Sequence, residues 1–207
     1  MSLISLLKSS GVRNFAKLLS ANVVAQVVGL LVYPILTRMY APEDFDLLNL
    51  FMSIGNVLIV LSIADYYYAI VLPKQEKDAV ALTHVSLLLL LLTTVLVAVS
   101  VLFSEQISMW FKLPKLSSYY WLMPFYVLMM GAWNILNYWY IRKKSFDRIS
   151  GYQISQSVLS SGGKIGMGYA GALQGGMIYA VVVAPLLSLL TSVALSFRRT
   201  LRPLLAW

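Results

Sequence analysis

Residues 79–103 read AVALTHVSLLLLLLTTVLVAVSVLF, and this stretch decides the fold class. It contains six consecutive leucines, Leu87 to Leu92, and its one ionisable side chain is His84. About 20 predominantly apolar residues are enough for an α-helix to cross the hydrocarbon core of a bilayer. The stretch therefore predicts a membrane-spanning helix.

The composition of the whole chain agrees with this interpretation. Of its 207 residues, 59% are hydrophobic and 12% are charged, and the mean hydropathy is +0.77. Soluble domains carry about 25% charged residues. The chain has no cysteine and one histidine, which excludes disulfides, thiolate ligands and a histidine-rich metal site. We predict that it has no metal and no cofactor.

Five other segments resemble residues 79–103 in length and apolar character. We expect an all-α, polytopic membrane helix bundle of about six transmembrane helices, at residues 15–38, 46–71, 79–103, 118–141, 150–173 and 177–197. The span 150–173 is the weakest, and a long loop is the alternative. It is rich in small residues, and small residues four apart let neighbouring helices approach closely. Two such pairs are Gly162 with Gly166 and Gly171 with Gly175.

The basic residues favour six crossings with a cytoplasmic N-terminus. Twelve of the 16 then lie in cytoplasmic segments: Lys8, Arg13, Lys17, Lys74, Lys77, Arg142, Lys143, Lys144, Arg148, Arg198, Arg199 and Arg202. Three lie outside, namely Arg38, Lys112 and Lys115, and Lys164 falls within the fifth span. Cytoplasmic loops carry an excess of Lys and Arg. The net charge of +8 is thus explained by the orientation of the chain in the membrane and by contact of its basic residues with lipid. We therefore predict no nucleic-acid partner.

Ionisable residues inside the predicted spans are candidate functional residues, because a charge at the bilayer centre costs at least about 2.5 kcal/mol. Asp65 and His84 lie about 9 and about 8 Å from the cytoplasmic ends of their helices. We predict that they form a pair; the alternative is that each meets water near the interface. Lys164 lies about 21 Å from the start of its predicted helix. It should therefore face a cavity or another helix.

Three strings in the N-terminal part resemble a known family. Residues 14–17 read NFAK, residues 33–45 read YPILTRMYAPEDF, and residues 69–74 read AIVLPK. In this order and spacing they resemble the N-terminal half of bacterial lipid-linked oligosaccharide flippases. These belong to the superfamily of multidrug, oligosaccharidyl-lipid and polysaccharide exporters. Relatives often carry an R-Y-E pattern where this sequence has Asp65, Tyr66 and Tyr67.

The resemblance implies that the protein moves an undecaprenyl-pyrophosphate-linked oligosaccharide across the inner (cytoplasmic) membrane for O-antigen or other surface polysaccharide assembly. It implies one lobe of a MATE-like exporter fold, so we expect a second bundle, or a homo-oligomer, as partner. Polysaccharide polymerase, glycosyltransferases and membrane lipid are the other expected partners. No P-loop or nucleophile elbow is present, and we predict that the chain is not an enzyme.

The same resemblance gives four candidate substrate contacts. Lys164 would attract the pyrophosphate; the alternatives are contact with backbone carbonyls and snorkelling to the interface. Arg38 would contact the headgroup, or snorkel. Asn22 and Gln26 share a helix face that we expect to point into the bundle, either lining the transport route or hydrogen-bonding to another helix.

Two other functions are compatible with the sequence. One is half of a MATE-like exporter of small molecules. The other is a non-transporting membrane remnant or assembly partner of polysaccharide-synthesis proteins. Neither is favoured by the three family strings.

Overall fold

The computed structural model describes residues 10–63, 66–112, 114–172 and 175–196, and these contain helices and turns but no strand. Six long helices account for most of them: α2 (Ser10–Met39), α3 (Pro42–Ile63), α4 (Glu76–Ser100), α7 (Met123–Arg142), α8 (Phe146–Tyr169) and α9 (Gly176–Ser196). Short helices connect them: η1 (Tyr66–Val71), η2 (Val101–Phe103), α5 (Ser104–Trp110), η3 (Pro114–Leu116) and α6 (Ser117–Tyr120). The predicted all-α, polytopic helix bundle is confirmed.

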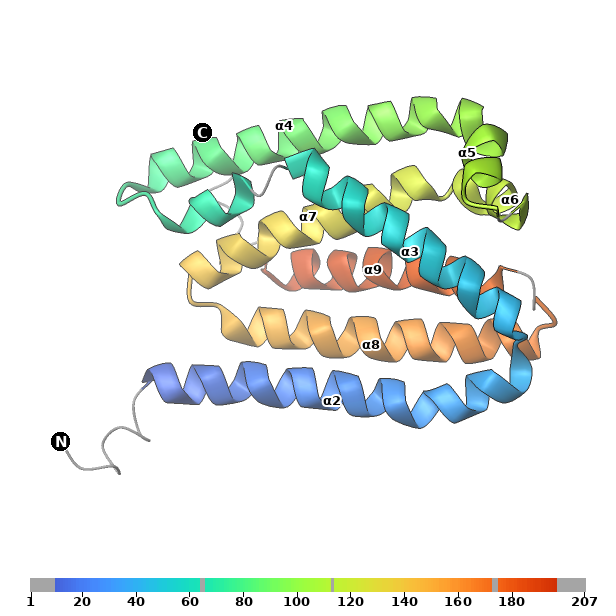
Figure 1. Ribbon diagram of the computed structural model, residues 1–207. Helices are drawn as coiled ribbons and strands as arrows, with labels where there is room; N and C mark the ends of the chain where they lie inside the picture. The colour runs from blue at the N-terminus through green and yellow to red at the C-terminus, as the bar shows by residue number, and fades with distance from the viewer. Residues whose placement is uncertain (1–9, 64–65, 113, 173–174, 197–207) are drawn as a thin grey trace.

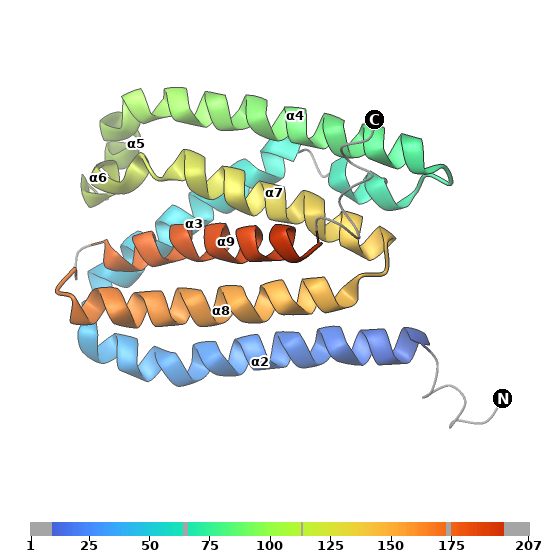
Figure 2. The ribbon, with the colours of Figure 1, turned by 180° about the vertical axis from the view of Figure 1, so that it is seen from behind.

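The long helices run back and forth between two ends of the bundle. Helices α2, α4 and α8 begin at one end, and α3, α7 and α9 begin at the other (Figure 1). Helix α8 lies between α2 and α9, while α3 crosses obliquely on the face opposite α9, as the view from behind confirms (Figure 2). The loops predicted to be cytoplasmic therefore share one end.

Four of these segments are long and apolar enough to cross a membrane: Ala16–Met39, Pro42–Ser62, Glu76–Trp110 and Gly176–Ser196. Helices α7 and α8 lie outside this set because their apolar residues alternate with Tyr, Asn, Ser, Gly and Lys164. Both nevertheless run between the same two ends as the other four (Figure 1). That α7 and α8 cross the membrane remains a prediction, which rests on the distribution of the basic residues.

Several helix ends differ from the predicted bounds. The second span divides into α3, which ends at Ile63, and the 3₁₀ helix η1 over residues 66–71. Helix α7 begins at Met123 rather than at 118, with Pro124 in its first turn, where proline is tolerated best. Helix α8 covers residues 146–169 rather than 150–173, so it begins and ends four residues earlier.

The turn between α2 and α3 is fixed by two hydrogen bonds. The backbone N–H of Ala41 donates to Oδ2 of Asp44 at 3.2 Å, the reach-back contact of a capping box. The hydroxyl of buried Tyr40 donates to the carbonyl oxygen of Lys164 at 2.7 Å, which ties this turn to α8. Burial, and then the Asp44 carboxylate, raises the pKa of Tyr40, so the hydroxyl keeps its proton.

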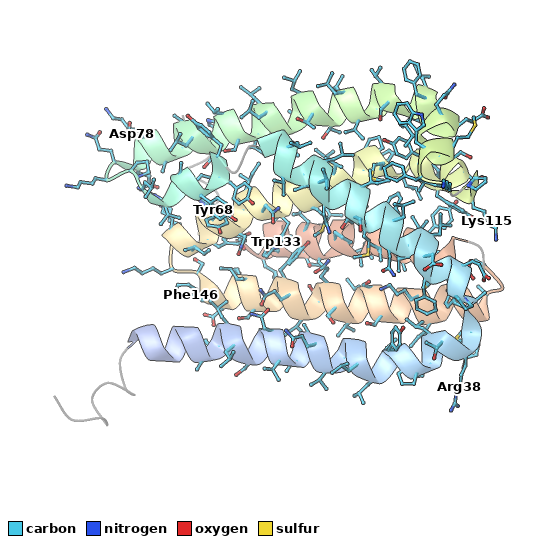
Figure 3. The ribbon with its side chains drawn as sticks, viewed as in Figure 1. Arg38, Tyr68, Asp78, Lys115, Trp133 and Phe146 are labelled. Atoms are coloured by element: carbon cyan, nitrogen blue, oxygen red, sulfur yellow. The ribbon has the colours of Figure 1, made fainter. Side chains whose placement is uncertain are left out.

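Aromatic side chains fill the core around α7. Trp139 and Tyr140 are fully buried, and Trp133 lies between α7 and α8, stacked on Tyr152 at an interplanar angle of 9° (Figure 3). Aromatic pairs of this kind add to the stability that burial alone provides. The Trp133–Tyr152 stack therefore joins α7 to α8, the least hydrophobic of the long helices.

The two predicted small-residue pairs do not mediate helix packing. A Cβ atom added at Gly162 or Gly166 would meet nothing within 4 Å. Gly171 and Gly175 have φ angles of +78° and +74° and lie in the connection between α8 and α9. Spacing alone suggested these pairs, and the prediction is wrong because helix α8 ends before Gly171. Close approach occurs instead at Gly163, where an added Cβ would lie 3.1 Å from Cβ of Ala180.

Gly171 closes helix α8 in a Schellman motif. The N–H of Ala172 donates to the carbonyl oxygen of Met167 at 3.0 Å, and the N–H of Gly171 donates to that of Gly168 at 3.2 Å. The left-handed conformation of Gly171 is what allows both bonds.

Replacing Gly175 with Ala should destabilise the protein more than replacing Gly171 with Ala. Both changes place a Cβ on a left-handed residue, which costs about 1–2 kcal/mol. At Gly171 the added Cβ meets open space, whereas at Gly175 it would collide with the ring of Tyr119. We expect about 1 kcal/mol for Gly171→Ala and about 3 kcal/mol for Gly175→Ala in denaturant unfolding of the purified protein. Equal losses would contradict the packing of Tyr119 on Gly175.

Candidate functional site

Lys164 lies in the C-terminal third of helix α8. It follows the first residue, Phe146, by about 27 Å and precedes the last, Tyr169, by about 8 Å along the axis. Its side chain is half-buried. The two ion pairs among the described residues, Lys17–Asp147 and Lys143–Glu76, do not involve it. Lys164 is thus a half-buried lysine with no acidic partner in the described part of the chain.

A polar stripe leads along α8 to Lys164. Gln153, Ser157, Ser160 and Lys164 are spaced by four, three and four residues, so they share one helix face, and all four are half-buried. The hydroxyl of Ser157 donates to the carbonyl oxygen of Ala25 at 2.9 Å, so the stripe runs beside α2. Oε1 of Gln153 is buried and has no hydrogen-bond partner among the described residues. The spacing of these residues in the sequence could have revealed the stripe.

Asn22 and Gln26 do not point into the bundle as predicted. Both are exposed, and neither forms a hydrogen bond with another described residue. The reason is that α2 packs chiefly on α8 and buries a narrow stripe that includes Ala21 and Leu36. Ala25, the residue before Gln26, accepts the hydrogen bond from Ser157, and Gln26 lies about 9 Å along the axis from the level of Lys164.

Arg38 is not brought to the polar stripe. Its side chain is exposed at the end of α2 and points away from the bundle (Figure 3). That orientation fits contact with water or headgroups at the membrane surface. Contact between Arg38 and a substrate stays a prediction.

The predicted pair of Asp65 and His84 is untested, because Asp65 lies outside the described residues. His84 is half-buried on α4, two turns after the helix begins at Glu76. No group of three or more His, Asp or Glu side chains that could hold a metal occurs in the described ranges.

Sequence reasoning missed the role of Arg142, which it assigned to orientation and lipid contact. The guanidinium donates to the carbonyl oxygens of Ile70 at 3.2 Å, Pro73 at 2.7 Å and Gln75 at 3.3 Å. Lys143 forms an ion pair with Glu76 at the start of α4. These contacts close the end of the bundle where α7 meets the η1–α4 loop. Backbone acceptors have no sequence signature, so no pattern could have indicated them.

The arrangement around Lys164 suits an anionic, hydrogen-bonding ligand. Helix α2 has no acidic residue, and Asp147, the one acidic residue of α8, lies in the first turn and is paired with Lys17. Lys164 therefore supplies positive charge, while Ser and Gln side chains of the stripe supply donors and acceptors. The described side chains along this face include no nucleophile paired with a general base.

Comparison with known protein families gives a match over most of the chain. Residues 35–207 match a family described as polysaccharide biosynthesis protein. Searches of curated proteins and of solved structures found no significant match to the chain.

Proposed function

Since the chain belongs to the polysaccharide biosynthesis protein family, with a role in polysaccharide biosynthesis or export, we propose that it moves a lipid-linked oligosaccharide across the cytoplasmic membrane. In this proposal it is a transporter and not an enzyme, and its N-terminus is cytoplasmic. The substrate is a polyprenyl-pyrophosphate-linked sugar chain destined for a cell-surface polysaccharide such as O-antigen.

The observation that carries the proposal is Lys164 in α8, which has no acidic partner among the described residues. Ionisable residues within a membrane span are costly, and they mark substrate or ion pathways when they persist. A pyrophosphate group bears negative charge and cannot enter the hydrocarbon without compensation. Lys164 would provide that compensation about 8 Å from the outer end of α8.

The polar stripe supports the same substrate class. Its hydroxyl and amide groups can replace the hydrogen bonds that sugar hydroxyls lose on leaving water. Asn22 and Gln26 extend this polar surface onto α2, exposed and without competing hydrogen bonds among the described residues. Together they would guide the headgroup along α2 and α8 toward Lys164.

Deleting the gene in its own host tests the proposal. We expect loss of a surface polysaccharide together with accumulation of its lipid-linked precursor in the inner leaflet, measured by glycan staining and by accessibility to an impermeant glycosidase. Normal polysaccharide would contradict the proposal. So would absence of the precursor itself, which indicates a role in synthesis, and so would altered drug sensitivity with unchanged glycans, which indicates a small-molecule exporter.

A further inference from the structure

The chain that follows α4 exposes large apolar side chains at one end of the bundle. Leu102 is 81% exposed, Phe103 56% and Trp110 79%, and Met109 and Phe111 are exposed as well. We call these five residues the apolar patch. A group of exposed large apolar side chains marks a surface that contacts a protein or a membrane.

The length of α4 places the apolar patch at the membrane surface. The apolar segment Glu76–Trp110 has 35 residues, and as one straight helix it would be about 52 Å long. The hydrocarbon core of a bilayer is about 30 Å thick, and the whole bilayer is about 40–45 Å thick. Helix α4 alone has 25 residues, so its length of about 37 Å is enough to cross the hydrocarbon core. The residues after Ser100 therefore begin at the level of the lipid headgroups.

At this level the chain turns instead of extending α4. Residues 101–103 form the 3₁₀ helix η2, and Phe103 has φ −107° and ψ 19°, outside the α-helical region, before α5 begins at Ser104. Helix α5 then runs across the end of the bundle (Figures 1 and 2) and packs on η3 and α6. Because α4 crosses the membrane, a helix that lies across its end is roughly parallel to the membrane plane.

Helix α5 has an apolar side and a polar side. Phe103 and Trp110 are seven positions apart, so they share one side of the helix. Exposed Glu105 lies on a different side, and Ser108 faces the bundle, where it is buried. The apolar patch is also continuous along the chain with the exposed leucines of the membrane helix α4, such as Leu96. This continuity favours lipid as the partner of the patch.

Two lysines follow the apolar patch. Lys112 ends α5 in a left-handed conformation, and its N–H donates to the carbonyl oxygen of Met109 at 3.1 Å. Lys115 lies in η3. Both lysines are exposed, and neither forms an ion pair with a described residue. Lysine stems lie along apolar surface while the ammonium groups stay in the polar layer, where lipid phosphates are available.

We propose that α5 and the apolar patch form an in-plane membrane anchor, and that the surface they contact is the interfacial layer of the phospholipid bilayer. Phe103 and Trp110 enter the boundary between headgroups and acyl chains to a depth of about 5–10 Å, and Lys112 and Lys115 contact the phosphates. The anchor fixes the level of this end of the bundle relative to the membrane surface. It does not depend on the proposed translocation or on which leaflet holds this end.

Depth measurement with spin labels tests the anchor. Since the chain has no cysteine, the single variants Leu96→Cys, Phe103→Cys, Glu105→Cys, Trp110→Cys and Lys115→Cys can each be labelled with a nitroxide without other changes. The full chain is reconstituted in vesicles of phosphatidylethanolamine and phosphatidylglycerol. Depth follows from the accessibility of each label to oxygen, which dissolves in lipid, and to a water-soluble nickel chelate. All five side chains are exposed, so the labels should be tolerated.

The anchor predicts a specific order of depths. Labels at Phe103 and Trp110 should lie at the same level, about 5–10 Å below the phosphates. The label at Leu96 should lie about 10 Å deeper than that at Phe103, because seven helical residues separate them. Glu105 and Lys115 are the matched controls, since they are exposed at the same end of the bundle, and their labels should be accessible to the nickel chelate.

Three results would overturn the anchor. Labels at Phe103 and Trp110 as accessible to the nickel chelate as the label at Lys115 would place the patch in water. Labels shielded from both reagents would show that another protein or a second copy of the chain covers it. A difference in depth of about 10 Å between Phe103 and Trp110 would show that α5 continues the membrane span of α4.

Discussion

Replacing Lys164 with Ala at the chromosomal locus is expected to reduce export of the surface polysaccharide about tenfold or more. A hydrogen bond to a charged group contributes about 1.5–3 kcal/mol, and 1.4 kcal/mol corresponds to a factor of ten. Export would be measured as surface glycan per cell, with the lipid-linked precursor quantified in parallel. Lys164→Arg should retain part of the activity, because it keeps the charge with a different geometry.

Folding and function can be separated for this change. The hydrogen bond from Tyr40 reaches the backbone carbonyl of Lys164, so the alanine variant keeps it and should accumulate normally in the membrane. Lys115→Ala is the control, since it removes an exposed lysine from η3 at the end of the bundle. Normal export by the Lys164→Ala protein would exclude this residue from the transport route.

Replacing Arg142 with Ala is expected to lower the free energy of unfolding by about 2–4 kcal/mol. The change leaves the carbonyl oxygens of Ile70, Pro73 and Gln75 without their charged donor. We expect a lower midpoint of denaturant unfolding in detergent and faster proteolysis between η1 and α4. Both follow because Arg142 is the group that holds this loop against α7.

Two variants distinguish hydrogen bonding from net charge. Arg142→Lys keeps the positive charge but cannot span three carbonyls with a planar fork, so it should lose most of the stability. Lys144→Gln removes a charge from the neighbouring exposed position and should change the unfolding free energy by less than about 0.5 kcal/mol. Equal effects of Arg142→Ala and Lys144→Gln would show that charge alone matters.

The sequence predicted the helices well because their signal is local. The apolar run at Leu87 to Leu92 predicted a long helix, and the structure places this run within α4. The polar segment around Lys164 is also helical, as the charge distribution favoured. Each of these conclusions depends on residues that are close together in the chain.

The exposure of a polar face and the role of a glycine pair depend instead on which helices pack against each other. Spacing places Asn22 and Gln26 on one face, but only the packing of α2 against α8 decides that this face is exposed. Spacing likewise cannot tell a helical glycine pair from two turn glycines such as Gly171 and Gly175. The hydrogen bonds from Arg142 likewise join α7 to backbone carbonyls of another segment, and they are visible only in three dimensions.

The packing of α2 on α8 has a consequence for the order of synthesis. The residues that join them, Ala25 and Ser157, are 132 positions apart. At about 5–20 residues per second, α2 waits roughly 7–26 s for its partner to be made. Helix α2 must remain in the bilayer without α8 during that interval, which its apolar sequence allows. Helix α8 is synthesised when α2 is already in the membrane. Helix α2 can therefore provide a packing surface for a segment that is too polar to insert unaided.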